Sequence, residues 1–337
     1  GDNPLTAKAI AKEVGLVKSE NDLVLTSSEI NNMTDEEVKK VLPRLRVIAR
    51  SLPEDKKRLV VLSQEMGLVT GMTGDGVNDA PALKRSDVGF AMGSGSEVAK
   101  EVSDIIILDD NFLSIAKTIL FGRTIFKSIR KFIIFQLSVN ITAVSLSVIG
   151  PLFGIVAPVT VVQMLWINMI MDTLAGIAFS YEPPLEEYMN EQPITKKTPI
   201  INKYMKSEII FSGLYQAIIC LIFLKIPFID NLIRYSNDNR YLMTSYFALF
   251  VFMGVFNAFN ARTERINIFA NLKHNKVFTI IISFILITQI IIIYKGGTIF
   301  RTYGLLPHEL LLTIIIALSI IPADWLRKLY IKKKLTK

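Results

Sequence analysis

Hydrophobic and polar positions divide this chain into two regions of different character. Residues 1–130 mix charged and apolar positions as soluble proteins do, whereas most of the remainder consists of long runs of Ile, Leu, Phe and Val. Six of these runs have the roughly 20 residues that a helix needs to cross a bilayer. We predict membrane-spanning helices at about 132–151, 157–180, 207–229, 241–260, 277–295 and 306–325.

The first region shows signals for alternating helices and strands. Helical spacing of apolar residues predicts helices at about 6–15 and 35–42, and a proline-led segment predicts a third at 53–66. Short apolar runs at 47–50 and 68–72 predict strands. Strands that alternate with helices are typical of a parallel sheet covered by helices on both faces, so we expect an α/β domain.

An acidic loop follows the second predicted strand. Asp75 and Asp79 lie within five residues of each other, together with Asn78. Acidic groups at the carboxyl end of a parallel strand are where α/β folds place chemistry. Carboxylates combined with phosphate oxygens suit Mg²⁺, so Asp75 and Asp79 are candidate magnesium ligands. Gly74 and Gly76 let the backbone approach a phosphate closely.

The residues of this loop resemble a known family. The string Gly-Asp-Gly-Val-Asn-Asp-Ala-Pro-Ala-Leu-Lys at 74–84 resembles the hinge motif of P-type cation-transporting ATPases, and the resemblance continues through 87–93 and 108–112. It implies the C-terminal portion of such a pump. The expected fold is a partial haloacid-dehalogenase-like (Rossmann-type) α/β domain followed by an all-α bundle of six transmembrane helices. We assign 1–112 to the phosphorylation domain, 113–131 to a stalk, 132–329 to the transmembrane domain and 330–337 to a basic tail.

The resemblance also implies roles in phosphoryl transfer from ATP. Asp75 matches the family's Mg²⁺ ligand, and Asn78 and Asp79 match residues that hold phosphate and order the site. Lys56 resembles the lysine that neutralises the phosphate, and Asp2 resembles the end of the family's Thr-Gly-Asp motif. The phosphorylated aspartate of Asp-Lys-Thr-Gly-Thr does not occur in this sequence. We therefore expect the catalytic centre to need a missing N-terminal part of the same pump.

Charge supports a membrane protein rather than a nucleic-acid-binding one. The formal net charge is +8, but the basic residues gather at the ends of apolar runs, where membrane flanks carry them. The positive-inside rule places the loops 181–206 and 261–276 and the C-terminus in the cytoplasm. The N-terminal domain then lies on the side where ATP is found.

Polar residues within the predicted spans indicate a cation site. An ionisable residue at bilayer depth is costly and is by default a functional candidate. Asp172 lies deep in the second span with Asn168 four residues earlier, and Asn140 lies in the first span. A carboxylate with two amide oxygens makes a plausible cage for a hard cation.

The segments around these residues resemble two helices of calcium pumps. Residues 162–173 resemble the sixth and 135–144 the fifth transmembrane helix, with a leaning toward the plasma-membrane type. Two-site calcium pumps have a glutamate at Ala143, a threonine at Met171 and an acidic residue in the segment 252–257, all absent here. The resemblance implies one Ca²⁺ per cycle, exported from the cytoplasm across the plasma membrane.

Other interpretations remain open at this stage. The transported ion could be Mn²⁺ or a monovalent cation, and the chain could be a non-catalytic remnant of a pump. A haloacid-dehalogenase-type phosphatase on a membrane anchor would also explain the acidic loop. Asp172 and Asn168 argue against that phosphatase, because an anchor needs no intramembrane carboxylate.

Overall fold

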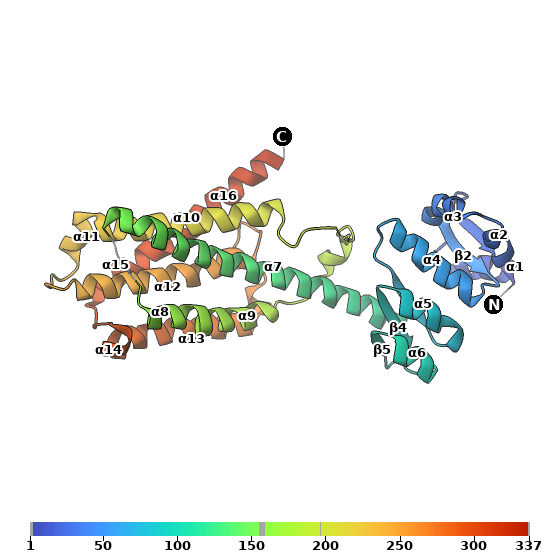
Figure 1. Cartoon of the computed structure of the whole chain (residues 1–337), viewed down its shortest axis with the longest axis horizontal. Coiled ribbons are helices and arrows are strands. Elements are labelled where there is room, and N and C mark those ends of the chain that lie inside the picture. The colour runs from blue at the N-terminus through green and yellow to red at the C-terminus, as the bar shows by residue number, and fades with distance from the viewer. Residues whose placement is uncertain (1–2, 155–158, 196, 336–337) are drawn as a thin grey trace. The chain divides into compact units, whose positions relative to one another are not determined.

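The computed structural model describes residues 3–154, 159–195 and 197–335 (Figure 1). The chain forms two compact units. One comprises Gly1–Leu120 with Met189–Thr198, and the other comprises Phe121–Tyr188 with Pro199–Lys337.

The first unit begins with a small two-stranded sheet. Strands β1 (Leu23–Thr26) and β2 (Leu45–Ala49) pair in parallel. Helices α1 (Pro4–Glu13), α2 (Ser27–Asn31), α3 (Asp35–Val41) and α4 (Pro53–Glu65) belong to the same part of the chain. Thr26 and Thr34 open α2 and α3 with capping boxes, because each hydroxyl accepts from a backbone N–H and each is followed three residues later by Glu. Ile30, Val38 and Leu62 form the apolar core.

A second sheet carries the acidic loop. Strands β3 (Gly71–Gly74), β4 (Val88–Met92) and β5 (Ile105–Ile107) pair in parallel in that order. The 3₁₀ turn η2 (Val77–Asp79) and helices α5 (Ala80–Arg85) and α6 (Glu97–Val102) connect them. The expected α/β architecture is confirmed, but as two small parallel sheets rather than one. Among the described strands, β2 and β3 each pair on one side only.

The predicted strand at 68–72 is displaced in the structure. It begins at Gly71, after Leu68 and Val69, whose side chains are exposed. The backbone N–H of Thr70 donates to Asp87 Oδ2 at 2.8 Å, so this residue is held by a side chain just before ladder pairing starts. The run of apolar residues alone therefore predicted a strand that begins too early in the sequence.

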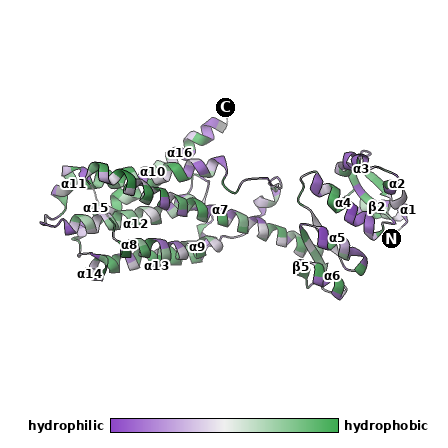
Figure 2. Cartoon of the chain, in the orientation of Figure 1, coloured by the Kyte–Doolittle hydropathy of each residue, from purple (hydrophilic) through white to green (hydrophobic). Residues whose placement is uncertain are grey.

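The second unit contains the predicted membrane helices. Six helical segments are long and apolar enough to cross a membrane. Hydrophobic residues run along them, whereas the first unit mixes both kinds (Figure 2). The segments are α7 (Phe112–Ile149), then α8 (Val161–Leu165) with the π-helical η4 (Trp166–Met171) and α9 (Asp172–Ser180), then α10 (Lys203–Lys225), α12 (Arg240–Arg262), α13 (Lys276–Lys295), and α15 (Pro307–Leu318) with α16 (Ile320–Leu335). The residues predicted as a stalk are the first part of α7, which continues unbroken into the first span.

Helix α12 forms the centre of this bundle. Every residue from Thr244 to Val255 is buried, and the helix packs against α10, α13, α15 and α16. Close approach elsewhere depends on a small residue: a side chain at Gly213 of α10 would lie 2.6 Å from Ile141 Cγ2 of α7. A glycine is therefore needed where these two helices meet.

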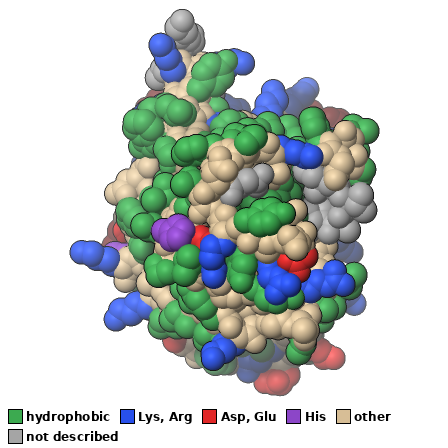
Figure 3. Space-filling view, turned by 90° about the vertical axis from the view of Figure 1, so that its left-hand side faces the viewer, with side chains coloured by type: hydrophobic (Ala, Val, Ile, Leu, Met, Phe, Trp, Pro, Cys, Tyr) green, Lys and Arg blue, Asp and Glu red, His purple; other side chains and the backbone are tan. Residues whose placement is uncertain are grey.

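One end of the bundle carries the short helices α11 (Pro227–Leu232) and α14 (Gly297–Phe300). Seen end-on, Lys and Arg side chains are scattered there among hydrophobic ones (Figure 3). This distribution agrees with the sparse basic residues that the sequence places in these loops, such as Arg234, Lys295 and Arg301.

Candidate functional site

The acidic loop after β3 is organised around Asp79. Its side chain is buried, and Oδ1 forms an ion pair with Lys56 Nζ at 2.5 Å. Its other oxygen, Oδ2, accepts from the backbone N–H groups of Asp75 at 3.2 Å and Gly76 at 3.3 Å. The fold thus brings together Lys56, Asp75, Gly76 and Asp79 from two helical starts and one strand end.

Gly74 makes room for this carboxylate. A Cβ on Gly74 would lie 2.4 Å from Asp79 Cβ and 2.7 Å from its Cγ, closer than real Cβ atoms approach. At Gly76 the nearest atoms would be 3.9 Å away, which is ordinary contact. The sequence interpretation assigned both glycines to phosphate approach. In the structure the space beside Gly74 holds Asp79.

Lys56 is directed by residues that the sequence analysis did not single out. It lies in the first turn of α4, next to the buried Asp55. Asp55 Oδ2 accepts from Ser27 Oγ at 2.5 Å and from the backbone N–H of Leu52 at 2.8 Å. These bonds anchor the start of α4 against α2. The signal in the sequence was an acidic residue three positions after the helix cap.

A second loop supports the backbone of Asp75. The N–H of Ser96 donates to the carbonyl oxygen of Asp75 at 2.7 Å, and a Cβ on Gly95 would meet the same oxygen at 2.9 Å. Asp110 in turn accepts from the N–H of Ser94 at 3.0 Å. Backbone hydrogen bonding from Ser94 holds the pKa of Asp110 below its usual value. Asp110 in the 108–112 segment therefore holds the Ser94–Ser96 loop, which in turn supports the acidic loop at Asp75.

The two aspartates of the loop, Asp75 and Asp79, differ in burial and in the partners of their carboxylates. Burial raises the pKa of Asp79, but the hydrogen bond and charge of Lys56 and two backbone N–H groups outweigh it and lower that pKa. Asp79 is thus an ionised carboxylate with both oxygens engaged. Asp75 and Asn78 are exposed, and in the part of the chain that the structure describes the Asp75 carboxylate has no hydrogen bond or ion pair.

This donor set fits Mg²⁺ through Asp75 more readily than through Asp79. A free carboxylate at the end of a parallel strand can take a hard cation, whereas Asp79 would first have to give up Lys56 or a backbone partner. Among the described residues no group of three or more His, Cys, Asp or Glu side chains could hold a metal. Further oxygen ligands would have to come from phosphate or water. Asp2, the remaining predicted catalytic residue, lies outside the described residues.

The candidate cation site lies in the second span. Asp172 is 3% exposed, and its Oδ1 has no hydrogen-bond partner among the described atoms. It follows directly on η4, a π-helical turn of the kind often found at functional sites. Asn168 lies within that turn and is exposed, while Asn140 on α7 is half-buried. The structure therefore buries Asp172 and leaves Asn168 outside the packed interior of this unit.

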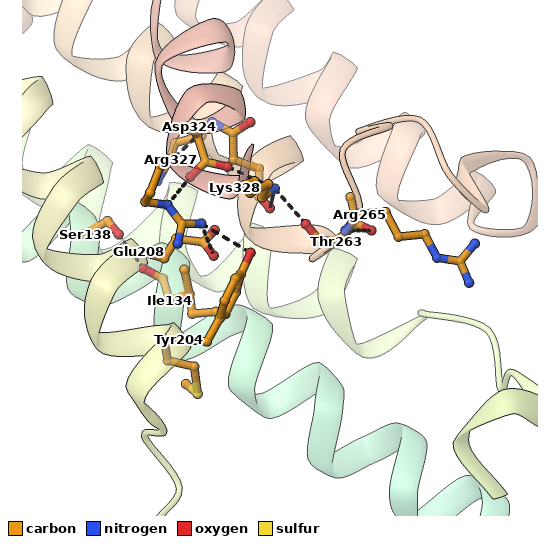
Figure 4. Close-up of polar contacts among 12 residues, drawn as sticks. Ile134, Ser138, Tyr204, Glu208, Thr263, Arg265, Asp324, Arg327 and Lys328 are labelled. Atoms are coloured by element: carbon orange, nitrogen blue, oxygen red, sulfur yellow. Dashed lines mark hydrogen bonds and ion pairs between the residues drawn. The ribbon is translucent and has the colours of Figure 1, made fainter. Parts of the chain in front are cut away.

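Two further charged networks lie inside the second unit, and the sequence analysis missed both. One joins α10 to α16: Arg327 pairs with Glu208 at 2.8 Å and Asp324 at 2.5 Å, and Lys328 donates to the carbonyl oxygen of Thr263 at 2.7 Å (Figure 4). Tyr204 also accepts from Arg327. The other surrounds Glu182, beyond the end of α9. The sequence analysis did not predict these networks, because the pairs that join different helices, such as Glu208 with Arg327, are far apart in the sequence.

Comparison with known proteins covers both units. Residues 156–330, just over half of the chain, match the family model for the C-terminus of cation-transporting ATPases. Residues 70–119 match the model for haloacid dehalogenase-like hydrolases, which confirms the expected class of the α/β domain.

Similar proteins are calcium-transporting ATPases by name. A probable calcium-transporting ATPase 6, plasma membrane-type, from Oryza sativa subsp. japonica is 41% identical over 94% of this chain and 31% of its own length. Calcium-transporting ATPase 2 of Schizosaccharomyces pombe is 41% identical over 89% of this chain and 23% of its own. Calcium-transporting ATPase 10, plasma membrane-type, of Arabidopsis thaliana is 41% identical over 88% and 28%.

The chain thus spans less than a third of the length of these relatives. Its six apolar helices identify it as an integral membrane protein. The family model, the relatives and the haloacid dehalogenase-like segment confirm the resemblance read from the acidic loop, and the chain belongs to the cation-transporting ATPase family, of which it represents a C-terminal portion.

Proposed function

We propose that this chain is the C-terminal portion of an ATP-driven pump that exports Ca²⁺ from the cytoplasm through an aspartyl-phosphate cycle, with one ion site. The observation that carries the proposal is Asp172, a buried intramembrane carboxylate with an unpartnered oxygen, in a chain of the cation-transporting ATPase family. A cation bound there would supply the partner that the carboxylate lacks. The names of the relatives support Ca²⁺ as that cation.

The first unit would provide the phosphoryl-transfer half of this pump. Mg²⁺ would be held by Asp75 and would neutralise charge on the phosphate oxygens of ATP. Lys56 supplies a cation at the same loop, and Asp79 orients that lysine and the backbone N–H groups of Asp75 and Gly76. Asn78, exposed beside them, is available for a phosphate oxygen.

The nucleophilic aspartate would come from the part of the pump that precedes this portion in the relatives. The open edges of β2 and β3 support that proposal, since each pairs on one side only among the described strands. Unpaired edges of this kind accept further strands. A pocket of about 630 Å³ lies beside β2, and Ser51 and Lys56 are among the residues that line it.

We further propose that the first unit, the 181–206 and 261–276 loops and the C-terminus lie in the cytoplasm, and that the pump works in the plasma membrane. The basic residues of these segments support the orientation through the positive-inside rule.

Uptake of radioactive Ca²⁺ into inverted vesicles by the complete pump tests the proposal. Asp172→Asn keeps the shape of the side chain and removes its charge, and we expect it to abolish ATP-dependent uptake. Asp238→Asn is the matched control, because Asp238 is exposed and pairs with the exposed Arg240 in a connecting loop. If the unsubstituted pump takes up no Ca²⁺, or if Asp172→Asn transports as well as Asp238→Asn, the calcium assignment is wrong.

A further inference from the structure

One carboxylate, Glu182, joins four helices of the second unit. It lies two residues beyond α9, the helix that begins with Asp172, and it is 8% exposed. Its Oε2 pairs with Lys131 Nζ of α7 at 2.5 Å. Its Oε1 accepts from Asn275 Nδ2 at 2.8 Å and faces Arg262 Nη1 of α12 at 3.5 Å. We call these four residues the Glu182 hub.

The partners of Glu182 are themselves fixed to helix ends. Asn275 caps α13, since its Oδ1 accepts from the N–H of Phe278 at 2.8 Å. Its amide nitrogen also donates to the carbonyl oxygen of Ala178 in α9 at 3.2 Å. Arg262 is the last residue of α12 and donates through Nη2 to Ile268 O at 2.9 Å and Ala270 O. The hub therefore sets where α13 begins and how the connection from α12 runs.

An aromatic layer joins the same helices again. Phe135 of α7 lies 5.9 Å from Phe179 of α9, measured between ring centroids. Phe179 lies 5.7 Å from Phe278 of α13, and Phe259 of α12 lies 5.3 Å from Phe278. Because polar and apolar contacts connect the same four helices, the middle of α7, around Lys131, is tied to the C-terminal end of α9.

The ion pairs of the Glu182 hub depend on every member being present. Lys131 and Arg262 form ion pairs with Glu182 at mostly buried positions, and removing one member of such a set leaves the others without compensation. Interactions of this kind act over short distances and have a defined geometry. A displacement of α7 therefore draws Glu182 with it, or breaks the pair.

We propose that Glu182 is a positioning residue that couples movement of α7 to Asp172 through α9. This inference rests on the proposed function, because it assigns to the hub the transmission between phosphoryl transfer and the cation site. Asp172 and Glu182 are ten residues apart on one continuous stretch of chain, and Lys131 and Asn140 share α7. Glu182 itself binds no transported ion.

The test compares Ca²⁺ uptake with ATP hydrolysis in the same inverted vesicles containing the complete pump. We expect Glu182→Gln to lower the number of Ca²⁺ ions moved per ATP by about tenfold, in the range of measured couplings between sites. Lys131→Gln should lower the same ratio, and the double variant should be no worse than Glu182→Gln alone. Lys131→Arg, which keeps the charge, should retain most of the ratio.

Glu187→Gln is the matched control. Glu187 pairs with Arg265 at 2.7 Å in the same pair of connections, but both side chains are about half exposed, so the ratio should not change. A merely structural role for Glu182 would reduce the amount of folded pump and leave the ratio unaltered.

Three results would overturn the inference: an unchanged ratio in folded Glu182→Gln, effects of the two substitutions that multiply independently, or an equal loss in Glu187→Gln. If Glu182→Gln does not fold, Lys131→Gln against Lys131→Arg decides the question. If the unsubstituted pump moves no Ca²⁺, the calcium assignment fails separately, and the ratio is measured with whichever cation stimulates ATP hydrolysis. If no cation does so, both proposals are wrong.

Discussion

Replacing Gly74 with alanine tests the geometry of the acidic loop most directly. The new Cβ would lie 2.4 Å from Asp79 Cβ, 2.7 Å from Cγ and 2.8 Å from Oδ2. Asp79 cannot yield freely, because Lys56 and the N–H groups of Asp75 and Gly76 hold its two oxygens. The clash therefore has to displace either the strand end or the carboxylate.

The expected cost follows from known effects of overpacking. Inserting one carbon into a packed site typically destabilises by about 1–3 kcal/mol. For a domain of this size that lowers the unfolding midpoint by about 4 °C per kcal/mol, so the decrease should be about 4–12 °C. A displacement of the carboxylate by about 1 Å would also misplace Lys56, and we expect it to reduce Mg²⁺-dependent ATP hydrolysis by about a hundredfold.

Thermal unfolding and ATP hydrolysis of the purified complete pump measure both effects. Gly71→Ala makes the same chemical change three residues earlier in β3, where the nearest atom would be Phe90 Cε2 at 3.5 Å. That variant should behave like the unsubstituted protein. If Gly74→Ala unfolds at the same temperature as Gly71→Ala and hydrolyses ATP equally well, our account of why this glycine is required is wrong.

Two further predictions concern charge and packing. Because the pKa of Asp79 is lowered below the usual value of an aspartate, its ion pair with Lys56 stabilises the fold above about pH 4 and is lost as the pH falls through the lowered pKa. In Lys56→Met only burial and the two backbone hydrogen bonds still act on the pKa of Asp79, so that pKa should rise and acid unfolding of the first unit should begin at higher pH. Identical acid transitions in the variant and the unsubstituted protein would contradict this direction of the pKa change. In the bundle, Gly213→Ala would place a carbon 2.6 Å from Ile141 Cγ2 and should destabilise by about 1–3 kcal/mol in detergent. Gly254→Ala, with nearest contacts at 3.6 Å, should be tolerated, and equal unfolding midpoints would refute the close-approach argument.

The sequence predicted the six spans well because each is a long apolar run whose signal does not depend on tertiary contacts. The short strands were harder. β1, β4 and β5 have three to five residues each and were not identified, and β3 was placed three residues early. In runs this short, the pattern of apolar residues cannot distinguish a strand from a buried turn. Pairing with strands far away in the sequence decides where each strand begins and ends.

Site residues could be predicted where they lie together in one sequence motif. They could not be predicted where only the tertiary structure brings them together. Asp75 and Asp79 lie in one loop, so their sequence shows them. Lys56 came from the family resemblance, and its contact with Asp79 joins residues 23 positions apart. Glu182 was not singled out as a site residue, because its partners Lys131 and Arg262 are separated from it by 51 and 80 positions. No local pattern reports such pairs.

The open edges of β2 and β3 have a consequence for how the sequence can vary. The bonds that an edge offers come from backbone N–H and C=O groups, which are the same for nearly every residue type. Side chains along these strands can therefore change through evolution while the edge keeps its capacity to pair. Proline is the exception because it removes a donor, and an insertion of one residue would turn every following side chain to the opposite face. Substitutions in β2 and β3 should accordingly be common except at Gly74, where Asp79 leaves no room for a side chain, and insertions, deletions and prolines should be rare.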